Sequence, residues 1–323
     1  MNRETEKDYL VRRIQPDKCF DSLLEFPSYF EIETVNACNA RCPMCTIEDW
    51  HRSSPVIKDG LFEKISSEIC GHSGHVKRVS LYRDGEPLLD KKLANRINVF
   101  KEGGIQDVSI STNGALLTED KSRDLLEAGL DTIILSIDSL QKEIFESIRV
   151  RLVFEEVLEN ALNFISLRDK LRSGTKVWVR MVRQEENYDE WPSFEKYWLK
   201  HLSDQDRVNY HNVHNWGGQL KGFKAVSNSH EKNLPCVALW GLMIIFSNGD
   251  VPLCNVDYNN KYPTGSVLHD SIADVWQSGV MEQRREHHLS GEKAKISLCE
   301  NCNVWEEPPD LESVVDDYIK ENA

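Results

Sequence analysis

The segment "ACNARCPMCT" at residues 37–46 carries three cysteines, Cys38, Cys42 and Cys45, in the spacing C-x3-C-x2-C. It follows the β-rich run "YFEIETV" at 29–35, so the three thiols come just after the end of the first predicted strand. In a parallel α/β enzyme, active sites form at that end of the strands. Three thiols at this place indicate a metal centre within an active site.

The spacing alone leaves the kind of metal centre open. A structural zinc site usually has four protein ligands, and here His51 or Glu48 would have to supply the fourth. The alternative is a [4Fe–4S] cluster with three irons held by thiolates and one iron open. The fourth ligand would then come from outside the chain.

Short β-rich runs alternate with longer amphipathic segments from about residue 28. The predicted strands are 29–35, 78–84, 107–112, 132–138, 176–182 and 207–213. The predicted helices between them are 59–70, 88–102, 118–129, 141–171 and 188–202. This alternation predicts an α/β fold with a parallel sheet and right-handed crossovers. Six such strands can form an open doubly wound sheet or a partial barrel, and the pattern does not choose between them.

The pattern changes after about residue 225. The segment "VALWGLMIIFSNGDVPLCNVD" at 237–257 predicts two apolar strands joined at Asn248-Gly249, because both positions of a tight hairpin turn favour positive φ. A helix is predicted at 270–289, followed by "CENC" and an acidic tail. We therefore expect a domain boundary near residue 225.

Composition and charge limit the possible partners and compartment. The chain has 323 residues, 40% hydrophobic and 28% charged, and a net charge of −14. This charge argues against nucleic acid or an anionic membrane as a partner, because phosphate binding needs clustered Lys and Arg. The longest apolar run, 238–246, is too short to cross a bilayer, and the N-terminus lacks the apolar core of a secretory signal. We expect a cytoplasmic protein, in which nine cysteines indicate metal or redox chemistry and not disulfides.

The cysteine loop, placed after the first strand, resembles that of the radical S-adenosylmethionine (SAM) enzymes, which have a partial (β/α)6 TIM-like barrel. The resemblance implies a [4Fe–4S] cluster with three Cys ligands whose open iron binds the amino and carboxylate groups of SAM. It also implies reductive cleavage of SAM to a 5′-deoxyadenosyl radical. Where the family usually has an aromatic residue this chain has Met44, which we expect to pack against the adenine.

Further similarities to this family lie at the ends of the next three predicted strands. They are "DGEP" at 84–87, "STNG" at 111–114 and "SIDS" at 136–139. Each is weak alone, because these residue types occur in any turn, but together with the cysteine loop they mark four consecutive strand ends. Arg149 is either a partner of the SAM carboxylate or an exposed helix arginine. The SAM contacts that the resemblance implies are Gly85, Glu86, Ser111, Asn113, Ser136, Asp138 and Arg149.

Four more cysteines have the spacing C-x17-C-x44-C-x2-C. They are Cys236, Cys254, Cys299 and Cys302. The spacing alone fits a zinc site and a [4Fe–4S] cluster about equally. The segment, with Gly249 in C-x12-G-x4-C, resembles the SPASM/twitch auxiliary-cluster domains of radical SAM enzymes. Pro308 stands where the two-cluster form has its next cysteine, so the resemblance implies one auxiliary [4Fe–4S] cluster with four Cys ligands. The spacing is most similar to that of aminocyclitol dehydrogenases that oxidise 2-deoxy-scyllo-inosamine.

The predicted organisation has four parts. They are an N-terminal extension at 1–27, a radical SAM partial barrel at 28–225, an auxiliary-cluster domain with a β-hairpin and helix at 226–310, and an acidic tail at 311–323. The short extension leaves no room for the leader-binding domain of many peptide-modifying relatives. We therefore expect a small-molecule substrate, together with a flavodoxin or ferredoxin-type electron donor that the resemblance implies.

The favoured reaction is dehydrogenation of a secondary alcohol of a sugar or aminocyclitol, with the auxiliary cluster accepting an electron. Arg180 and His214 lie near the ends of late strands and are candidates for orienting or deprotonating the hydroxyl. Alternatively, Arg180 pairs with Glu31 or Glu33, and His214 only packs beside Trp216. Other hypotheses remain open: epimerisation of a sugar or peptide carbon, cross-linking of a ribosomal peptide, or a metal-bearing interaction protein without enzymatic activity.

Overall fold

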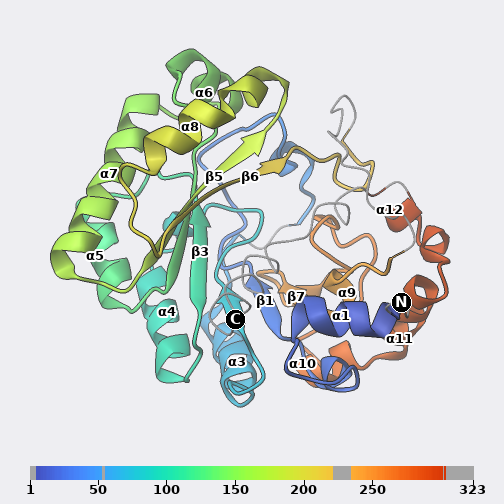
Figure 1. The fold of residues 1–323 in the computed structure, drawn as a ribbon. Coiled ribbons are helices and arrows are strands. Elements are labelled where there is room, and N and C mark those ends of the chain that lie inside the picture. Colours follow the sequence, from blue (N-terminus) through green and yellow to red (C-terminus); the bar gives the residue numbers. More distant parts are fainter. Residues whose placement is uncertain (1–4, 53–54, 221–233, 301, 303–323) are drawn as a thin grey trace.

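The computed structural model describes residues 5–52, 55–220, 234–300 and 302 (Figure 1). Among these residues, seven strands form the central sheet. They are β1 (Tyr29–Ile32), β2 (Arg78–Ser80), β3 (Val108–Thr112), β4 (Thr132–Ser136), β5 (Lys176–Arg183), β6 (Arg207–Asn212) and β7 (Leu242–Ile245). The first six fall on the six predicted strands, which confirms that part of the sequence analysis.

The order of the strands decides between the two predicted architectures. It runs β6-β5-β4-β3-β2-β1-β7, and all neighbouring strands are parallel. From β1 to β6 each strand lies beside its predecessor, so the sheet winds in one direction. A doubly wound sheet would instead reverse its order at a switch point. The fold is therefore the partial TIM-like barrel.

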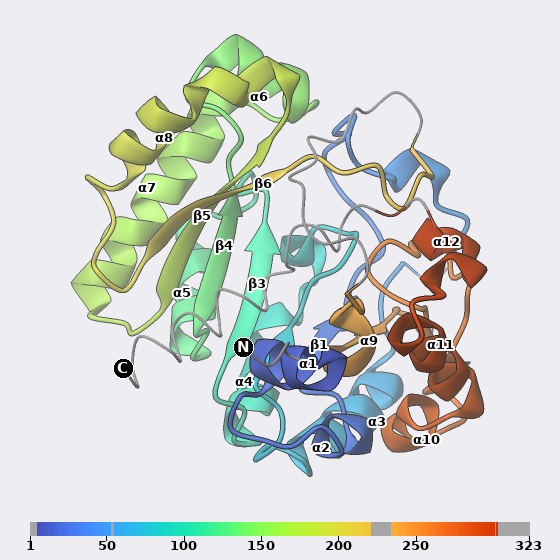
Figure 2. The ribbon, with the colours of Figure 1, turned by 45° about the vertical axis from the view of Figure 1, so that its right-hand side comes forward.

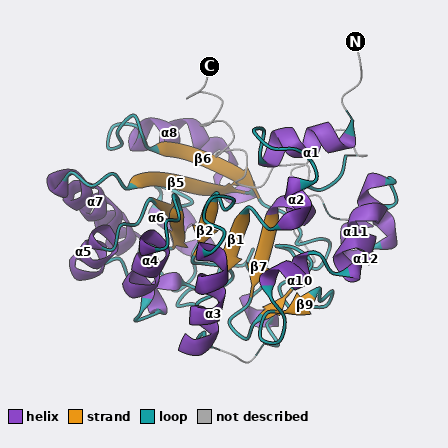
Figure 3. Ribbon diagram, turned by 90° about the horizontal axis from the view of Figure 1, so that it is seen from below, coloured by secondary structure: helices purple, strands orange, loops and turns teal. Residues whose placement is uncertain are grey.

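Helices cover the outer face of this sheet (Figures 1 and 3). They are α3 (Asp59–Cys70), α4 (Leu93–Glu102), α5 (Glu119–Glu127), α6 (Lys142–Ile148), α7 (Phe154–Leu171) and α8 (Trp191–Trp198). Short 3-10 helices follow three of the strands: η1 (Ile47–Asp49) follows β1, η2 (Pro87–Leu89) follows β2 and η3 (Glu185–Glu190) follows β5. Ile110, Ile133 and Val177 share one register position in three adjacent strands and are fully buried. They belong to the core between the sheet and these helices.

The predicted helix at 141–171 is interrupted, and this is a correction to the sequence analysis. Between α6 and α7, Arg151 has a φ of 78°, a left-handed conformation that a right-handed helix cannot contain. The carbonyl of Val150 in the same turn accepts a hydrogen bond from the backbone N–H of Arg41, at 3.0 Å. The interruption therefore lets the α6–α7 turn contact the three-cysteine loop.

The C-terminal part also differs from its prediction. The turn at Asn248-Gly249 is present, with Gly249 at a φ of 91°, but its flanking strands join different sheets. β7 pairs with the edge of β1, and β8 (Asp250–Val251) pairs with β9 (Gly265–Ser266). The free edge of β1 offers β7 four residues of parallel pairing, which the short β8 cannot match.

Helices complete the C-terminal part on the side opposite to α4–α8 (Figures 1 and 2). They are α9 (Ala238–Gly241), α10 (Ile272–Trp276), α11 (Gly279–Leu289), η4 (Lys293–Lys295) and α12 (Ser297–Glu300). The helix predicted at 270–289 is thus two helices, because Ser278 caps the start of a new one by accepting from the N–H of Met281.

The N-terminal helices α1 (Glu6–Ile14) and α2 (Ser22–Glu25) pack against this C-terminal part (Figure 2). A Cβ at Gly241 would lie 3.1 Å from the Ile14 side chain, so α1 and α9 approach closely. The indole N–H of Trp276 in α10 donates to the carbonyl of Leu23 in α2, at 3.0 Å. None of the helices described is long and apolar enough to cross a membrane.

Candidate active site at the strand ends

Cys38, Cys42 and Cys45 lie in the loop between β1 and α3, at the carboxyl end of the sheet. The loop is tightly turned: the N–H of Cys45 donates to the carbonyl of Cys42 at 2.9 Å, and the N–H of Ala40 points to the Cys38 sulfur at 3.4 Å. A backbone N–H aimed at sulfur stabilises a thiolate more than a thiol. This hydrogen bond thus favours the thiolate form of Cys38, which binds metal, against the effect of burial.

The three thiols share one electrostatic environment. Burial raises the pKa of Cys38, and it raises the pKa of Cys45 to about 12. A charge on Cys42 raises both values further, so the three thiols act on one another. Three adjacent thiolates are unfavourable in a buried loop without a cation, and a bound metal deprotonates its cysteine ligands.

The described residues do not support a zinc site in this loop. Among them, no three His, Cys, Asp or Glu side chains are close enough together to bind one metal ion. The two predicted extra ligands, His51 and Glu48, are exposed. In a [4Fe–4S] cluster each thiolate binds a different iron, so its ligands stand farther apart than the ligands of a single ion. The donor set therefore fits a cluster better than a zinc ion.

Gly85 lets the segment after β2 pass directly beneath the cysteine loop. A Cβ at this position would lie 2.0 Å from the Val35 carbonyl oxygen and 2.9 Å from that of Ala37. Only glycine permits this approach. The next N–H, that of Glu86, donates to the carbonyl of Ala37 at 2.8 Å, which fixes the two segments together.

The Glu86 carboxylate is buried and held by three donors. One oxygen accepts from the hydroxyl of Thr112 at 2.7 Å and the N–H of Leu88 at 3.0 Å, and the other accepts from the N–H of Asn113 at 2.9 Å. Burial raises its pKa, and these hydrogen bonds oppose the increase. A carboxylate can accept about four hydrogen bonds. One position remains for a donor such as an ammonium group.

Asn113 places a polar group beside the same loop, and Ser111 and Ser136 lie next to each other on neighbouring strands. The amide nitrogen of Asn113 donates to the side chain of Asn39 at 2.8 Å and lies 3.9 Å from the Cys38 sulfur. The hydroxyls of Ser111 and Ser136 are 3.4 Å apart across β3 and β4. The structure thus brings the predicted residues of these two strand ends together.

Asp138 and Arg149 form a buried ion pair, with 2.6 Å between the Arg149 Nε and the carboxylate. The other Asp138 oxygen accepts from the N–H of Val182 at 2.8 Å. Arg149 also points an Nη toward the Cys42 sulfur, at 3.7 Å. The alternative of an exposed helix arginine is wrong, because its side chain is only 12% exposed and follows the end of α6. The guanidinium places a fixed positive charge beside the thiols.

The segment after β6 reaches the cysteine loop from the other side. The indole N–H of Trp216 donates to the carbonyl of Met44 at 2.9 Å. The Nδ1 of His214 accepts from the N–H of Trp216 at 3.2 Å, and the two rings are 4.9 Å apart. Burial lowers the pKa of His214 to about 4, helped by His211 and Arg83. His214 is therefore neutral at physiological pH. It packs beside Trp216, as the second interpretation in the sequence analysis expected.

Arg180 of β5 is level with Ser136 of β4 and Asn209 of β6. In adjacent parallel strands, residues at one level point to the same face of the sheet. Arg180 thus belongs to the same inward face as Ser136. Of its two predicted partners, Glu33 pairs with Arg52, at 2.5 Å.

The four C-terminal cysteines are also within electrostatic reach of one another. Burial raises the pKa of Cys236 to about 11 and of Cys299 to about 12, and it raises that of Cys254 well above its usual value. Charges on neighbouring thiols raise these pKa values further. A charge on Cys302 raises the pKa of Cys236, and charges on the other three cysteines raise the pKa of Cys254. Buried thiols gathered in this way fit a metal cluster, for the same reason as the first loop.

The sequence analysis missed a buried charged network between the two cysteine sets. Arg52 pairs with Glu33 and with Asp84, the latter at 2.9 Å, and Arg83 pairs with Asp84 at 2.9 Å and with Glu31 at 3.4 Å. The only sequence signal was the presence of Glu31 and Glu33 in the β-rich run at 29–35 and of Arg83 and Asp84 beside "GEP". Their partners are far apart in the chain, so no local spacing reveals the pairs.

Comparison with known families accounts for both cysteine sets. Residues 32–192 match the family described as "Radical SAM superfamily". Residues 236–303 match SPASM, described as "Iron-sulfur cluster-binding domain". SAM and iron–sulfur cluster binding follow from these two matches together with the thiol sets described above.

Curated relatives differ in what they catalyse. The chain is 33% identical to the GTP 3',8-cyclase of Chlorobaculum tepidum over 60% of this chain, but the match spans only 54% of that cyclase. It is 24% identical to the S-adenosyl-L-methionine-dependent 2-deoxy-scyllo-inosamine dehydrogenase of Niallia circulans over 85% of this chain and 92% of that enzyme. The second match thus covers most of both chains, at lower identity.

Two solved structures share the fold. The crystal structure of BtrN in complex with AdoMet and 2-DOIA superimposes with a TM-score of 0.59 at 21% identity, over 86% of this chain and 93% of BtrN. That of Streptococcus suis SuiB bound to precursor peptide SuiA has a TM-score of 0.65 at 16% identity, over 87% of this chain and 71% of SuiB. At these identities the likeness concerns the fold alone.

Proposed function

Because the chain belongs to the radical SAM superfamily, we propose that it dehydrogenates a secondary alcohol of a small sugar or aminocyclitol. We further propose two [4Fe–4S] clusters, one on Cys38, Cys42 and Cys45 and one on the four C-terminal cysteines. When bound, these cofactors supply a 5′-deoxyadenosyl radical that abstracts hydrogen and an acceptor for the second electron. The balanced reaction removes the carbinol hydrogen atom, the hydroxyl proton and one further electron, leaving a ketone and 5′-deoxyadenosine.

The C-terminal thiol set carries the proposal. Its four cysteines all come from this chain and act on one another electrostatically, so the site needs no ligand from a substrate. A cluster whose four irons all have cysteine ligands leaves no iron open for substrate, which favours a role in electron transfer. The match to 2-deoxy-scyllo-inosamine dehydrogenase along most of both chains supports an alcohol as the electron source.

In this proposal the strand-end residues bind and orient SAM. Glu86 offers its remaining acceptor position to the SAM ammonium group, within the backbone turn that Gly85 permits. Ser111, Asn113 and Ser136 provide hydrogen bonds to the ribose or carboxylate, and Met44 packs against the adenine. Arg149 is held by Asp138 and beside Cys42, so its charge serves the cluster loop more directly than the SAM carboxylate.

His214 and Arg180 are the candidate residues for the substrate hydroxyl. The Nδ1 of His214 accepts a hydrogen bond, so its neutral ring carries the proton on Nε2. It can therefore donate to a hydroxyl oxygen and orient it, but it has no free acceptor nitrogen for the hydroxyl proton. Arg180, level with Ser136, is placed to contact the substrate between β4 and β6.

The proposal also covers the cellular location of the enzyme, its electron donor and the kind of substrate. We propose a cytoplasmic location, where a flavodoxin or ferredoxin-type protein supplies the electron that starts each turnover. The net charge of −14 supports a small-molecule substrate over a nucleic acid or an anionic membrane surface.

The test is to trace one hydrogen atom. The reconstituted enzyme is incubated under reducing, anaerobic conditions with SAM and a panel of alcohols that includes 2-deoxy-scyllo-inosamine, deuterated at the carbinol carbon. We expect deuterium in 5′-deoxyadenosine and one ketone formed per SAM consumed. A Cys45→Ala variant should form neither, and a Cys19→Ala variant should behave as the parent.

The same experiment in D2O separates dehydrogenation from epimerisation. An epimerase returns a hydrogen to the substrate radical, so its product keeps the alcohol and gains solvent deuterium. Such a product would replace our proposal by epimerisation. SAM cleavage without oxidation of any alcohol in the panel would count against both reactions and favour peptide modification.

A further inference from the structure

Arg83 links the SAM-binding strand end to the auxiliary cysteines. It follows β2 and directly precedes the Asp84-Gly85 pair, and its side chain is only 7% exposed. One Nη donates to the backbone carbonyl of Asn255, the residue after Cys254. The guanidinium therefore lies against the backbone that presents an auxiliary ligand.

The electrostatic surroundings of Arg83 agree with a position close to Cys254. Burial acts to lower the pKa of Arg83, but Asp84, Glu31 and Glu33 raise it, and so does the Cys254 thiol. The overall direction is upward, so the guanidinium keeps its charge inside the protein. It is a permanent positive charge beside Cys254.

Two further cations stand close to the same thiol set. Arg284 of α11 donates to the carbonyl of Tyr262 at 2.9 Å, and the charges of Cys299 and Cys254 act on it. Lys293 of η4 acts on Cys236 and Cys299, lowering the pKa of both against the effect of burial. Cations thus act on the auxiliary cysteines from three separate elements of the fold.

The three-cysteine loop has different surroundings. The negative charge of Glu86 raises the pKa of Cys38, and that of Asp84 raises the pKa of Cys45. The positive charge of Arg149 lowers the pKa of Cys38. The charges near the first loop are therefore mixed, while the charges from outside the set that act on Cys236 and Cys299, those of Lys293 and Arg284, are positive. This contrast predicts different electron affinities at the two centres.

We propose that Arg83, assisted by Arg284, raises the reduction potential of the auxiliary cluster and so makes it the electron acceptor of the pair. Reduction adds a negative charge to a cluster, and a fixed buried cation stabilises the reduced form. Arg83 is thus a positioning residue that acts through Cys254. The inference rests on the proposed function, because it requires a cluster on the C-terminal cysteines.

The test measures the potential of the auxiliary cluster by itself. The full chain with Cys38, Cys42 and Cys45 changed to Ala is reconstituted with iron and sulfide, and its reduction is followed by EPR during a redox titration. We expect Arg83→Gln in this background to weaken reduction at least tenfold, which is about 59 mV for one electron. Arg83→Lys, which keeps the charge, should recover most of the difference.

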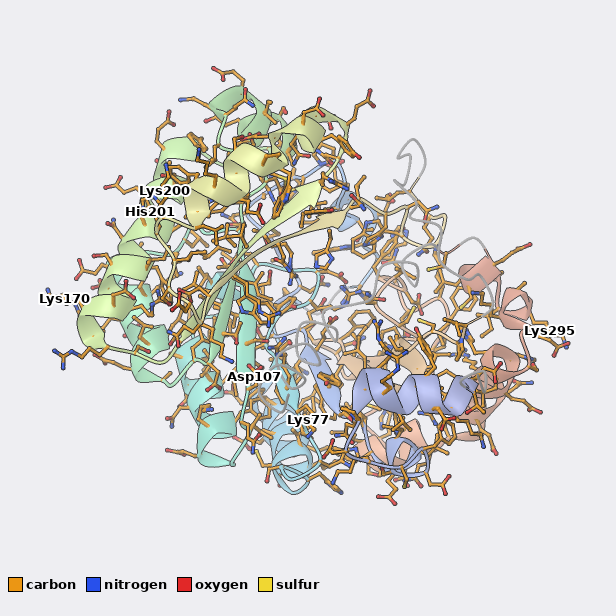
Figure 4. All side chains as sticks on the ribbon, in the orientation of Figure 1. Lys77, Asp107, Lys170, Lys200, His201 and Lys295 are labelled. Carbon is orange, nitrogen blue, oxygen red and sulfur yellow. The ribbon has the colours of Figure 1, made fainter. Side chains whose placement is uncertain are left out.

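A matched control removes a distant positive charge. Lys170, in α7, lies at the opposite side of the molecule from Lys295 of η4 (Figure 4). Lys170→Gln should leave the potential unchanged. If Arg83→Gln does not fold, Arg284→Gln provides the same measurement from α11, with the expected shift in the same direction.

The outcomes separate this inference from the proposed function. If the triple cysteine variant binds no iron, the auxiliary cluster itself is refuted, and the proposed electron transfer with it. If the cluster is present but its potential in Arg83→Gln or Arg284→Gln equals that of Lys170→Gln, the tuning role is refuted while the proposed dehydrogenation stands. An equal shift in Arg83→Lys and Arg83→Gln would also refute it, because shape and not charge would be responsible.

Discussion

Replacing Gly85 by Ala tests whether the close backbone contact under the cysteine loop builds the SAM site. The new Cβ would lie 2.0 Å from the Val35 carbonyl oxygen, and real Cβ contacts almost never fall below 3.0 Å. The two segments must therefore separate by about 1 Å. Neither neighbour is the flexible end of a side chain, so the backbone itself has to move.

The magnitude follows from what this movement breaks. The hydrogen bond from Glu86 to the carbonyl of Ala37 is 2.8 Å long, and 1 Å more takes it beyond bonding distance. Overpacking costs about 1–3 kcal/mol and the lost hydrogen bond about 1 kcal/mol. We expect the free energy of unfolding to fall by about 2–4 kcal/mol. SAM should bind at least about tenfold more weakly, because 1.4 kcal/mol of lost contact suffices for that.

The assay compares Gly85→Ala with Gly74→Ala, whose Cβ would meet nothing within 4 Å. Denaturant unfolding of the cluster-free proteins measures stability, and calorimetric titration of the reconstituted proteins measures SAM affinity. Gly74→Ala should change stability by no more than about 0.5 kcal/mol. The reasoning is refuted if Gly85→Ala matches Gly74→Ala in both measurements while binding normal amounts of iron.

Three further predictions concern buried charge, pH and iron. Arg149→Met leaves the fully buried Asp138 without its ion-pair partner, so the free energy of unfolding should fall by about 3–5 kcal/mol in a denaturation assay. Breaking the exposed Lys142–Glu155 pair should have little effect in the same assay. Burial holds the pKa of His214 at about 4, below its usual 6.5, so its stabilising effect is complete above pH 6.5 and is lost as pH falls from 6.5 toward 4. The parent should lose up to about 3 kcal/mol more than His214→Gln over this window, and equal losses would show that His214 does not titrate as a buried neutral group. Finally, the triple Ala variant of Cys38, Cys42 and Cys45 should retain about four irons per chain, and adding Cys254→Ala should remove them; zinc in place of iron would contradict the second cluster.

Much of the barrel could be predicted because its signals are local. Alternating β-rich and amphipathic runs located all six strands of the first part. The three-cysteine loop was visible for the same reason, since its three thiols lie within eight residues. The polar strand ends at 111–114 and 136–139 also proved adjacent, as parallel order requires.

The parts that the sequence did not reveal depend on distant contacts. The break at Arg151 is favoured by docking against Arg41, more than a hundred residues away, while the local pattern from 141 to 171 is continuously helical. The pairing of β7 with β1 replaced a hairpin that Asn248-Gly249 made locally plausible. The network of Arg52, Arg83 and their carboxylates joins segments whose spacing in the chain has no fixed pattern.

The pairing of β7 with β1 has a consequence for the proposed electron transfer. The three-cysteine loop continues directly from β1, whereas Cys236 precedes β7 and Cys254 follows it closely. Ile32 lies opposite Ile245 in a four-residue parallel register, so the two cysteine sets start from neighbouring strands of one rigid sheet. A slip of one residue would shift β7 by about 3.3 Å and turn its buried Met243 and Ile245 to the other face. The register therefore helps to hold the segment from Cys236 to Cys254 in place beside the three-cysteine loop, as electron transfer from a substrate bound near that loop to the proposed auxiliary cluster would require.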